Sequence, residues 1–391
     1  MKTHCLHLLG LPHTTITKEF NCCAYSQKIL KLAGMLAPRG HEVILYSNEG
    51  ADVGVDIECV DILSEAERAS WFGKHDPQKL YDLRWDANEP YWRLFNDRCI
   101  EALKLRVAKG DFICSWSGNC QAPIAMAFPG SHTGIATGPF FVEAGVGYYG
   151  TFSRYRVFES HAHREWMMGA AGHKVSDNDT IVCENYWDLE DFVVKPISDD
   201  ANEFIEGVGS DYYLFLGRII VDKGWNVAVD VCRDIGAKLI IAGQGGVGQE
   251  FLDDSRNDHV FFFGRADTAE RARLMSGAIA CFCPTDFREP FGGTAVEAQL
   301  AGSPAITTDH GAFTQTVEEG WRCASHREFV EAALRAQKLT SADRANIKLK
   351  ASSLYSLDAI AVKYERYFDR LYARWFEGYY EMRNLETLTL P

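Results

Sequence analysis

One stretch in the last third of the chain constrains the fold more than any other. It covers residues 283–304 and reads CPTDFREPFGGTAVEAQLAGSP. Short apolar segments flank it at 278–283 and 305–309, and each has the length and composition of a buried strand. A helix is expected between the two strands, because Gly302 and then Pro304 follow in the order that commonly ends a helix.

Two carboxylates flank the start of this helix. Pro290 disfavours helical geometry at the residue before it, so Glu289 belongs to the loop. Glu297 lies inside the helix, about two turns further on. Gly292 and Gly293 stand at the helix start, where glycine lets a ligand approach the backbone closely. Free N–H groups and the helix dipole at this point attract an anion such as phosphate.

The carboxylates add a second property to the anion site. A carboxylate accepts hydrogen bonds from two neighbouring hydroxyls, which is the arrangement that ribose and hexoses offer. An anion cradle beside hydroxyl acceptors indicates a nucleotide-sugar ligand. The alternative is a capped surface helix with two solvated glutamates. The paired glycines and the strand on either side favour the ligand site.

Residues 289–304, EPFGGTAVEAQLAGSP, closely resemble the E-x7-E region of the GT-B glycosyltransferases of family 4. Two acids, two glycines, the helix stop and the proline occur in the same order. The resemblance is strong over about 212–317 and weaker over 1–47. It implies an α/β fold of two Rossmann-like domains that face each other across a cleft, with a C-terminal helix that crosses back to the first domain. The implied division is an acceptor-side domain at 1–190, completed by 366–391, and a nucleotide-sugar-binding domain at 191–365.

The length of the chain fits this organisation, because 391 residues are too many for one ordinary core and suit two domains of similar size. No apolar run reaches the roughly 18 residues of a membrane span, and the N-terminus lacks the features of a signal peptide. The 12 cysteines are scattered without a C-x-x-C pair. This favours reduced thiols in a cytoplasmic protein, and it argues against a zinc site and a disulfide framework. No integral membrane contact is expected, because no apolar run is long enough.

The formal net charge of −14 argues against general nucleic-acid binding. A phosphorylated ligand therefore needs local positive charge. Arg218 and Lys223 lie on one glycine-bounded loop, 217–224, directly after the strand expected at 212–216. An Arg fork and a Lys point charge both suit a phosphate. Alone they are ordinary surface cations, but the match to the family's G-R-x4-K-G arrangement implies that they meet the leaving diphosphate.

The first half opens with a βαβ unit, with strands expected at 4–9 and 43–46 and a helix at 24–37. The loop 10–21 lies at the carboxyl end of the first strand, where open α/β sheets bind ligands. The alternative is a solvated loop without a role. The resemblance implies that this loop faces the cleft and touches donor phosphate or acceptor through Pro12, His13 and Thr14.

One departure from the family pattern lies in the first half. Many family members carry a His beside the donor sugar, after a strand like the one expected at 111–115. Here that region reads SWSGN, residues 115–119, without a His. Either Asn119 or a nearby group substitutes for that ring, or the sugar is positioned differently. His161 is a second candidate for the replacement.

Residues 237–248, AKLIIAGQGGVG, contain three glycines in the G-x-G-x-x-G spacing of a dinucleotide-binding loop. That fingerprint normally follows the first strand of its domain and has an acidic partner further on, and this segment meets neither condition. An NAD-dependent dehydrogenase stays open as an alternative. In family 4 a glycine-rich turn here lines the nucleotide pocket and the end of the next strand holds the base, which implies donor-binding roles for Gly243, Gly264 and Arg265.

The remaining segments are assigned from periodicity. Residues 140–156, dense in Gly and aromatic side chains, are expected as a shaped loop. Residues 56–88 show no clean pattern and are expected as loops and short helices that contact an acceptor or cover the sheet. A strand is expected at 133–137 and the hinge between the domains near 188–200. Further helices are expected at 91–107, 121–128, 161–168, 225–235, 268–275, 328–336, 340–352 and 357–375.

Motif and resemblance together imply a retaining glycosyltransferase that moves a hexose-type sugar from a UDP- or GDP-linked donor to a glycan or another hydroxyl acceptor. Glu289 would grip hydroxyls of the transferred sugar and Glu297 those of the ribose. The departing phosphate would accept the proton of the acceptor. The donor site would be completed by Phe291, Gly292, Gly293 and Thr294.

No cofactor apart from the donor substrate is expected, and no metal, since the resemblance implies none. The expected partners are the nucleotide-sugar donor and the acceptor, and a homodimer is left open. Two alternatives remain for the function, an NAD-dependent dehydrogenase and a non-catalytic nucleotide-sugar-binding module.

Overall fold

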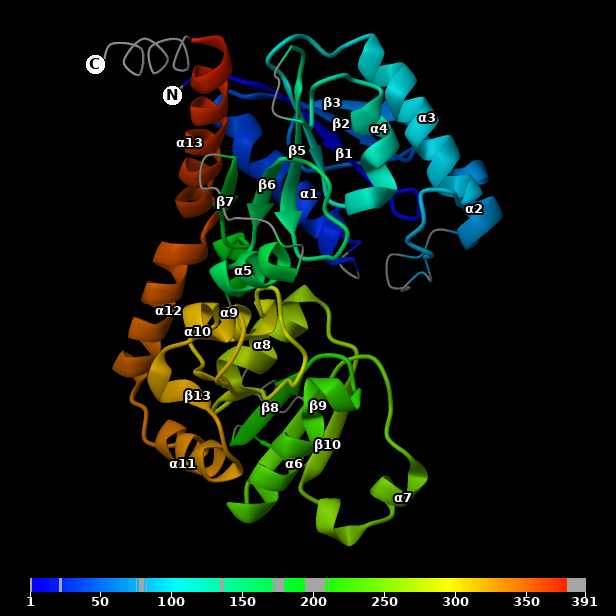
Figure 1. The fold of residues 1–391 in the computed structure, drawn as a ribbon. Coiled ribbons are helices and arrows are strands. Elements are labelled where there is room, and N and C mark those ends of the chain that lie inside the picture. Colours follow the sequence, from blue (N-terminus) through cyan, green and yellow to red (C-terminus); the bar gives the residue numbers. More distant parts are fainter. Residues whose placement is uncertain are drawn as a thin grey trace, which may run out of the picture. The chain divides into compact units, whose positions relative to one another are not determined.

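The computed structural model describes residues 2–20, 23–74, 76, 81, 83–133, 137–170, 172, 179–193, 208–209 and 211–377. They fold into two compact units (Figure 1). The first unit takes its residues from 1–159, 164–186 and 357–391, and the second from 160–163 and 187–356. Among the described residues, no helix has both the length and the apolar character required to cross a bilayer.

Each unit is built on a parallel sheet with the same pattern of strand order. The first sheet has the order β3-β2-β1-β4-β5-β6-β7 and the second β10-β9-β8-β11-β12-β13. In both, the first strand lies inside the sheet and the order reverses beside it, which is the doubly wound Rossmann arrangement. The prediction of an α/β fold with two Rossmann-like domains is therefore confirmed.

The elements of the first half follow the expected alternation of strand and helix. In chain order they are β1 (Cys5–Leu9), α1 (Ala24–Leu36), β2 (Glu42–Ser47), β3 (Glu58–Asp61), α2 (Glu65–Phe72), α3 (Pro90–Lys104), β4 (Phe112–Ser115), α4 (Ala122–Met126), β5 (Phe140–Val146), β6 (Tyr155–Phe158), α5 (His161–Ala170) and β7 (Thr180–Val182).

The second half repeats the alternation and ends in three helices. Its elements are β8 (Tyr212–Leu216), α6 (Trp225–Asp234), β9 (Lys238–Ala242), α7 (Gln249–Leu252), β10 (Val260–Gly264), α8 (Thr268–Gly277), β11 (Cys281–Cys283), α9 (Gly293–Leu300), β12 (Ala305–Thr308), α10 (Phe313–Thr316), β13 (Arg322–Cys323), α11 (His326–Ala336), α12 (Ser341–Tyr355) and α13 (Leu357–Phe376).

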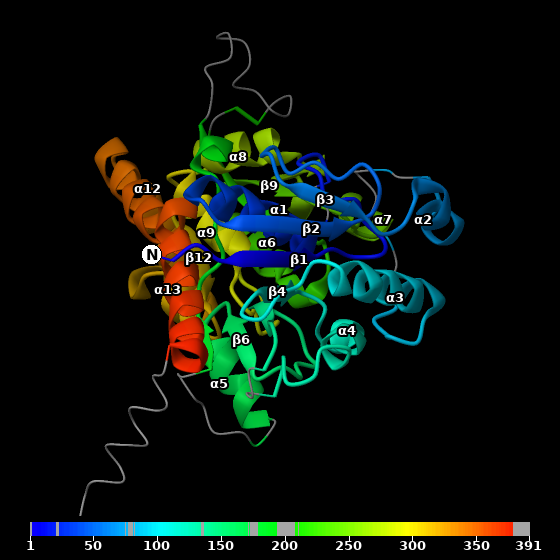
Figure 2. The same cartoon turned by 90° about the horizontal axis from the view of Figure 1, so that it is seen from above.

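The central strands of the first sheet, β1, β2, β4 and β5, are largely buried on both faces, as parallel strands between two helix layers must be. On β1, Leu6 and Leu8 join the core that α1 and α13 cover. Leu9 joins the core under α3 and α4, on the other face of the sheet. Figure 2 shows these two helices apart from α13. The alternation of side chains along a strand therefore assigns each residue of β1 to one helix layer or the other.

The C-terminal helix α13 belongs to the first unit, as the resemblance implied (Figure 1, red). The Tyr364 hydroxyl donates to the carbonyl of Ala144 at 3.1 Å, and the Tyr367 hydroxyl donates to the carbonyl of Asp179 at 2.6 Å. Near the end of the helix, Arg374 forms an ion pair with the Asp179 carboxylate, and both side chains are almost fully buried. These polar contacts fix the helix on the apolar surface that it covers.

One expectation for the first half is wrong. Residues 140–146 are the buried strand β5, whereas they were expected as the start of a loop. Gly145, one of the glycines that suggested a loop, and the buried Glu143 are each explained by a neighbouring group. Gly145 has φ +149° at a register shift, with the Trp116 ring where a Cβ would stand. The buried Glu143 carboxylate accepts hydrogen bonds from the backbone N–H groups of Phe152 and Ser153.

Two further expectations concern segments with weak patterns. No strand includes Thr133 or Thr137, and 134–136 lie outside the described residues. Within 56–88 the chain forms β3 and the capped helix α2, which begins at a capping box of Ser64 and Glu67.

The boundaries between the two units lie a few residues from the expected positions. The chain changes from the first unit to the second between residues 186 and 187 and returns between 356 and 357, whereas 190 and 365 were expected. Of the expected hinge near 188–200, residues 194–200 lie outside the described part of the chain.

Asp179→Asn tests how α13 is held. The substitution removes a carboxylate that pairs with the buried Arg374 guanidinium, so the free energy of unfolding should fall by about 3–5 kcal/mol. Urea denaturation followed by circular dichroism measures this change. Asp358→Asn is the control, because the Asp358 side chain is 96% exposed at the start of the same helix and should change stability little. Equal stability of both variants would contradict a role for the buried pair.

Candidate active site

The order of the second sheet creates a crevice at the carboxyl ends of its central strands. Strand β8 lies between β9 and β11. The helix after β8, α6, packs on one face of the sheet, and the helix after β11, α9, packs on the other. The loops that follow β8 and β11 therefore diverge, and such a switch point is where α/β sheets bind ligands.

A hollow lies at this switch point and gathers much of the predicted donor site. It is lined by the strand ends at Leu216 and Cys283 and by residues of both diverging loops. Sequence analysis had singled out five of the lining residues, which are Lys223, Glu289, Gly292, Gly293 and Thr294.

The start of α9 has the form that an anion site requires. Gly292 adopts the left-handed conformation, φ +78°, and a Cβ there would stand 2.4 Å from the Phe313 ring, so glycine is needed. Within the described part of the chain, the backbone N–H groups of Gly293 and Thr294 have no hydrogen-bond partner. Two donors at the positive end of the helix dipole thus line the hollow.

The two diverging loops are tied to each other beside the hollow. The carbonyl of Asp222 accepts hydrogen bonds from the Thr285 hydroxyl at 2.8 Å and from the backbone N–H of Asp286 at 3.0 Å. Gly224 has φ +72°, and a Cβ on it would stand 2.0 Å from the carbonyl oxygen of Pro284. Only glycine permits this approach, and the approach fixes the loop that carries Lys223.

Lys223 and Glu289 form an ion pair at the hollow, although 66 positions separate them in the sequence. Their side chains are 20% and 18% exposed. The ammonium group of Lys223 also lies 4.9 Å from the centre of the Phe287 ring. A cation and a carboxylate are therefore adjacent, in a position that water reaches only in part.

The other two predicted charged residues do not line this hollow. Arg218 is exposed, and its side chain has no ion-pair partner among the residues that the structure describes. The Glu297 carboxylate accepts a hydrogen bond from the Trp187 indole N–H at 3.1 Å and forms an ion pair with Arg271. Sequence reasoning missed Trp187 and Arg271, because neither belongs to the motif.

Phe291, expected in the donor site, has a side chain that lies in the core. It is 2% exposed and packs against the rings of Trp187 and Tyr355, with ring centres 5.8 and 5.7 Å apart. Any contact of this residue with a donor would have to come from its backbone. The phenylalanine instead anchors the loop that begins α9.

The glycine-rich segment after β9 packs against the chain rather than forming a dinucleotide fingerprint. Gly243 has φ +149°, and a Cβ on it would stand 1.8 Å from the carbonyl oxygen of Gly217. Its N–H donates to the carbonyl of Gly264, itself at φ +83°, at 2.7 Å. The helix that follows, α7, has four residues. Gly243 and Gly264 thus hold β9, β10 and the loop after β8 in register, and Arg265 follows directly at the end of β10.

His161 lies at the start of α5, on a segment that belongs to the second unit. The Ser160 hydroxyl donates to the carbonyl of Pro290 at 2.6 Å, and the backbone N–H of Ala162 donates to the Gln315 side chain at 3.0 Å. The segment therefore lies beside the residue next to Glu289. His161 itself is exposed.

The loop after β1 is held by contacts with residues further along the chain. Pro12, His13 and Thr14 are all buried. The Asn48 side-chain amide donates to the carbonyls of Pro12 and Thr14 at 3.0 and 2.8 Å, and the hydroxyls of Thr14 and Ser26 lie 2.8 Å apart. These polar contacts hold the loop from inside, and its contact with a donor or an acceptor stays a prediction.

His13 is neutral in this setting. Burial, with a smaller effect from the Arg68 guanidinium, lowers the pKa of its imidazole to about 3. Its ring packs against those of Phe72 and Trp85. Asn119, the other first-unit candidate, is exposed, and its backbone N–H donates to the carbonyl of Gly150 at 3.0 Å.

Comparison with known proteins agrees with this geometry. Residues 198–342 match the family model described as Glycosyl transferases group 1. This range contains every residue that lines the hollow. The chain is 32% identical over 116 residues to the glycogen synthase of Mycobacterium tuberculosis, which is 27% of this chain and 28% of that protein. It is 30% identical over 172 residues to the phosphatidyl-myo-inositol mannosyltransferase of the same species, 42% of this chain and 43% of that protein.

The likeness in structure extends over nearly the whole chain. The catalytic domain of starch synthase IV from Arabidopsis thaliana, solved with ADP and acarbose, covers 96% of this chain with all of its own length, at a TM-score of 0.68 and 13% identity. The fold is that of the GT-B glycosyltransferases, as the sequence resemblance implied. The sequence matches span less than half the length of the two relatives.

The pKa of His13 leads to a pH-dependent prediction. Because the folded-state pKa is depressed, the unfolded chain binds a proton below pH about 6.5 that the folded chain does not bind. Stability should therefore fall as the pH drops from about 6.5 towards 3, by about 1.4 kcal/mol per pH unit, or about 2 kcal/mol at pH 5. His13→Gln should remove this part of the slope. Urea denaturation at a series of pH values compares the two proteins, and parallel curves would contradict the assignment.

Proposed function

We propose that this protein is a retaining glycosyltransferase that moves a hexose-type sugar from a nucleotide-diphosphate sugar to a hydroxyl acceptor. One observation carries the proposal. The free N–H groups at the start of α9 and the Lys223–Glu289 pair line one hollow at the switch point of a Rossmann-like sheet. The same residues lie in the segment that matches Glycosyl transferases group 1. The anion site suits a phosphate, and the carboxylate suits a sugar hydroxyl.

The diphosphate would be stabilised as a leaving group. Negative charge grows on the departing phosphate in the transition state, and fixed donors aimed at it lower the barrier without reorganisation. Gly293, Thr294 and Lys223 supply such donors at the hollow. Arg218, exposed and without an ion-pair partner among the described residues, would swing to the diphosphate when the donor binds. These charges would make a metal ion at the phosphates unnecessary.

Glu289 would hold the transferred sugar. A lysine ammonium has three N–H donors, so Lys223 can keep its contact with Glu289 while it donates to a phosphate oxygen. The Glu289 carboxylate keeps lone pairs for two sugar hydroxyls and would orient the anomeric carbon. The acceptor hydroxyl would attack on the face from which the phosphate leaves, and the departing phosphate oxygen would take its proton. His161, on the segment beside Pro290, would contact the same sugar.

The ribose and base would occupy neighbouring positions. Glu297 is held by Trp187 and Arg271 through one oxygen each, and each carboxylate oxygen has a second lone pair for a ribose hydroxyl. Gly264 and Arg265 at the end of β10 would flank the base. UDP- and GDP-linked sugars are the proposed donors. An ADP-linked donor is the second candidate, because the starch synthase domain with a similar fold was solved with ADP.

The acceptor is proposed to be a glycan or another hydroxyl compound. The names of the two relatives give a polysaccharide in one case and a phosphatidyl-inositol in the other. Both compounds carry hydroxyl groups, and a hydroxyl group is all that the proposed chemistry requires of an acceptor. A dehydrogenase is not proposed, because the glycines after β9 pack against the loop after β8 and open no helix of useful length.

Lys223→Met and Arg218→Met test the diphosphate assignment. Each removes a positive charge from the leaving group, so kcat should fall by about 10²–10³-fold. Transfer from a radiolabelled donor to a glycan acceptor measures the rate. Arg327→Met is the control, because Arg327 is 87% exposed on α11 and pairs only with the neighbouring Glu331 among the described residues. Turnover close to that of the unaltered protein in both active-site variants would refute the assignment.

A thermal-shift panel identifies the donor. UDP, GDP, ADP and their sugars, each at 100 times its dissociation constant, should stabilise the folded protein by about 2.7 kcal/mol if bound. One base should stand out, and NADH should give no shift. Lys223→Met should weaken the shift given by the diphosphates and leave the melting temperature of the free protein nearly unchanged. A shift with NADH and none with any nucleoside diphosphate would overturn the proposal.

A further inference from the structure

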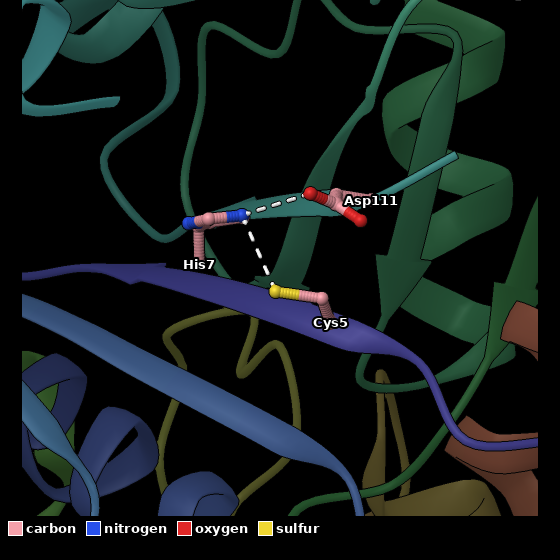
Figure 3. Close-up of side chains that lie close together, drawn as sticks. All are labelled: Cys5, His7 and Asp111. Atoms are coloured by element: carbon pink, nitrogen blue, oxygen red, sulfur yellow. Dashed lines mark hydrogen bonds and ion pairs between the residues drawn. The ribbon is translucent and has the colours of Figure 1, made fainter. Parts of the chain in front are cut away.

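Three side chains of types that can bind a metal ion lie close together in the first unit, on its parallel sheet. Cys5 and His7 are two residues apart on β1, so they point to the same face. In the register of β1 with β4, Leu6 pairs with Phe112, so Asp111 stands opposite Cys5, one position before that pair. Figure 3 shows the three side chains converging between the two strands.

The contacts converge on one nitrogen atom of His7. Its Nε2 lies 3.5 Å from Cys5 Sγ and 3.3 Å from Asp111 Oδ2. All three atoms lie within 4.8 Å of one another. The other ring nitrogen, Nδ1, lies 2.9 Å from the hydroxyl of Tyr46 on β2. His7 is fully buried, whereas Cys5 and Asp111 are partly exposed, which leaves a path from solvent.

This geometry does not suit a nucleophilic relay. A thiol activated by His and Asp contacts one ring nitrogen while the carboxylate contacts the other. Here both contact Nε2.

The spacing does suit a metal ion. Zinc binds His nitrogen and carboxylate oxygen at about 2.0–2.1 Å and thiolate sulfur at about 2.3 Å in tetrahedral geometry. These lengths place the nitrogen about 3.3 Å from the oxygen and about 3.6 Å from the sulfur. The two separations at Nε2 agree with these values. The third separation, between sulfur and oxygen, would shorten to its value in a zinc site by rotation of the two partly exposed side chains.

The surroundings of the cluster also favour a cation. If His7 donates its Nδ1 proton to Tyr46, the lone pair of Nε2 points into the cluster, which is the usual arrangement for a ligating His. Asp111 Oδ2 is held in place by the backbone N–H of Ala108 at 2.6 Å. A thiolate and a carboxylate together balance a divalent charge, and Glu42, the registered neighbour of Cys5 on β2, adds negative potential.

We propose that Cys5, His7 and Asp111 form a binding site for a zinc-type divalent cation, with water as the fourth ligand. On binding, the Cys5 thiol releases its proton to solvent and the sulfur–metal bond forms. The cluster lies at the start of β1 and before β4, the sheet edge opposite the carboxyl ends where α/β sheets carry out chemistry. The cation would tie β1 to β4 and stabilise the first unit. This site is independent of the proposed glycosyl transfer.

Cobalt is the probe for this site. Metal-free full-length protein titrated with Co²⁺ should bind one equivalent, with a thiolate-to-cobalt absorption band and the intense visible bands of a tetrahedral ion. Cys5→Ser should abolish the thiolate band, and Asp111→Asn should weaken binding at least tenfold. Tyr46→Phe removes the partner of Nδ1 and should weaken binding by about 10–100-fold. Zn²⁺ should displace the cobalt and raise the melting temperature of the unaltered protein but not that of Cys5→Ser.

The control is Cys59→Ser. Cys59 on β3 is the exposed cysteine among those that the structure describes, so adventitious binding to a thiol would occur there. The control should keep the full spectrum and affinity of the unaltered protein. A thiolate band that persists in Cys5→Ser, or that disappears in Cys59→Ser, would overturn the proposal. The absence of a thiolate-to-cobalt band in the unaltered protein would also overturn it.

Discussion

The close approach of two loops at the switch point of the second sheet is the constraint on which the candidate site depends. Gly224 lies against the carbonyl of Pro284 at a distance that no side chain permits, and the carbonyl of Asp222 accepts hydrogen bonds from the loop after β11. This contact sets Lys223 beside Glu289. The start of α9 follows three residues after Glu289, at Gly292, so one backbone contact aligns a cation, a carboxylate and two free N–H groups.

The first unit uses the same sheet order in a different way. Its loop after β1 occupies the position that binds ligands in such sheets, yet Asn48 and Ser26 hold it from inside, and the pKa of His13 is lowered by burial. The equivalent loop of the second unit keeps Arg218 exposed. The same topology therefore supports a loop with buried side chains in the first unit and a loop with an exposed arginine in the second, so fold alone does not define a site.

The strong local patterns were enough to predict most of the architecture. The strand at 212–216, the helix at 24–37 and the long C-terminal helix were predicted nearly to the residue, because apolar periodicity and end signals agree there. The segment 140–146 was misread, since Gly145 and its neighbouring glycines are typical of a loop until the Trp116 ring is seen beside Gly145. The prediction was wrong here because the reason for a glycine in this strand is a side chain that lies far away in the sequence.

The sequence by itself determined the βαβ alternation, the glycine-bounded loops and the helix start at Gly292, because each depends on residues within a few positions of one another. Tertiary structure alone decided which charged groups meet. It paired Lys223 with Glu289, placed Trp187 and Arg271 on Glu297, buried Phe291 and His13, and brought Asp111 to Cys5 and His7. The physical reason is that contacts between strands and loops far apart in the chain follow from sheet register and packing, which no local pattern encodes.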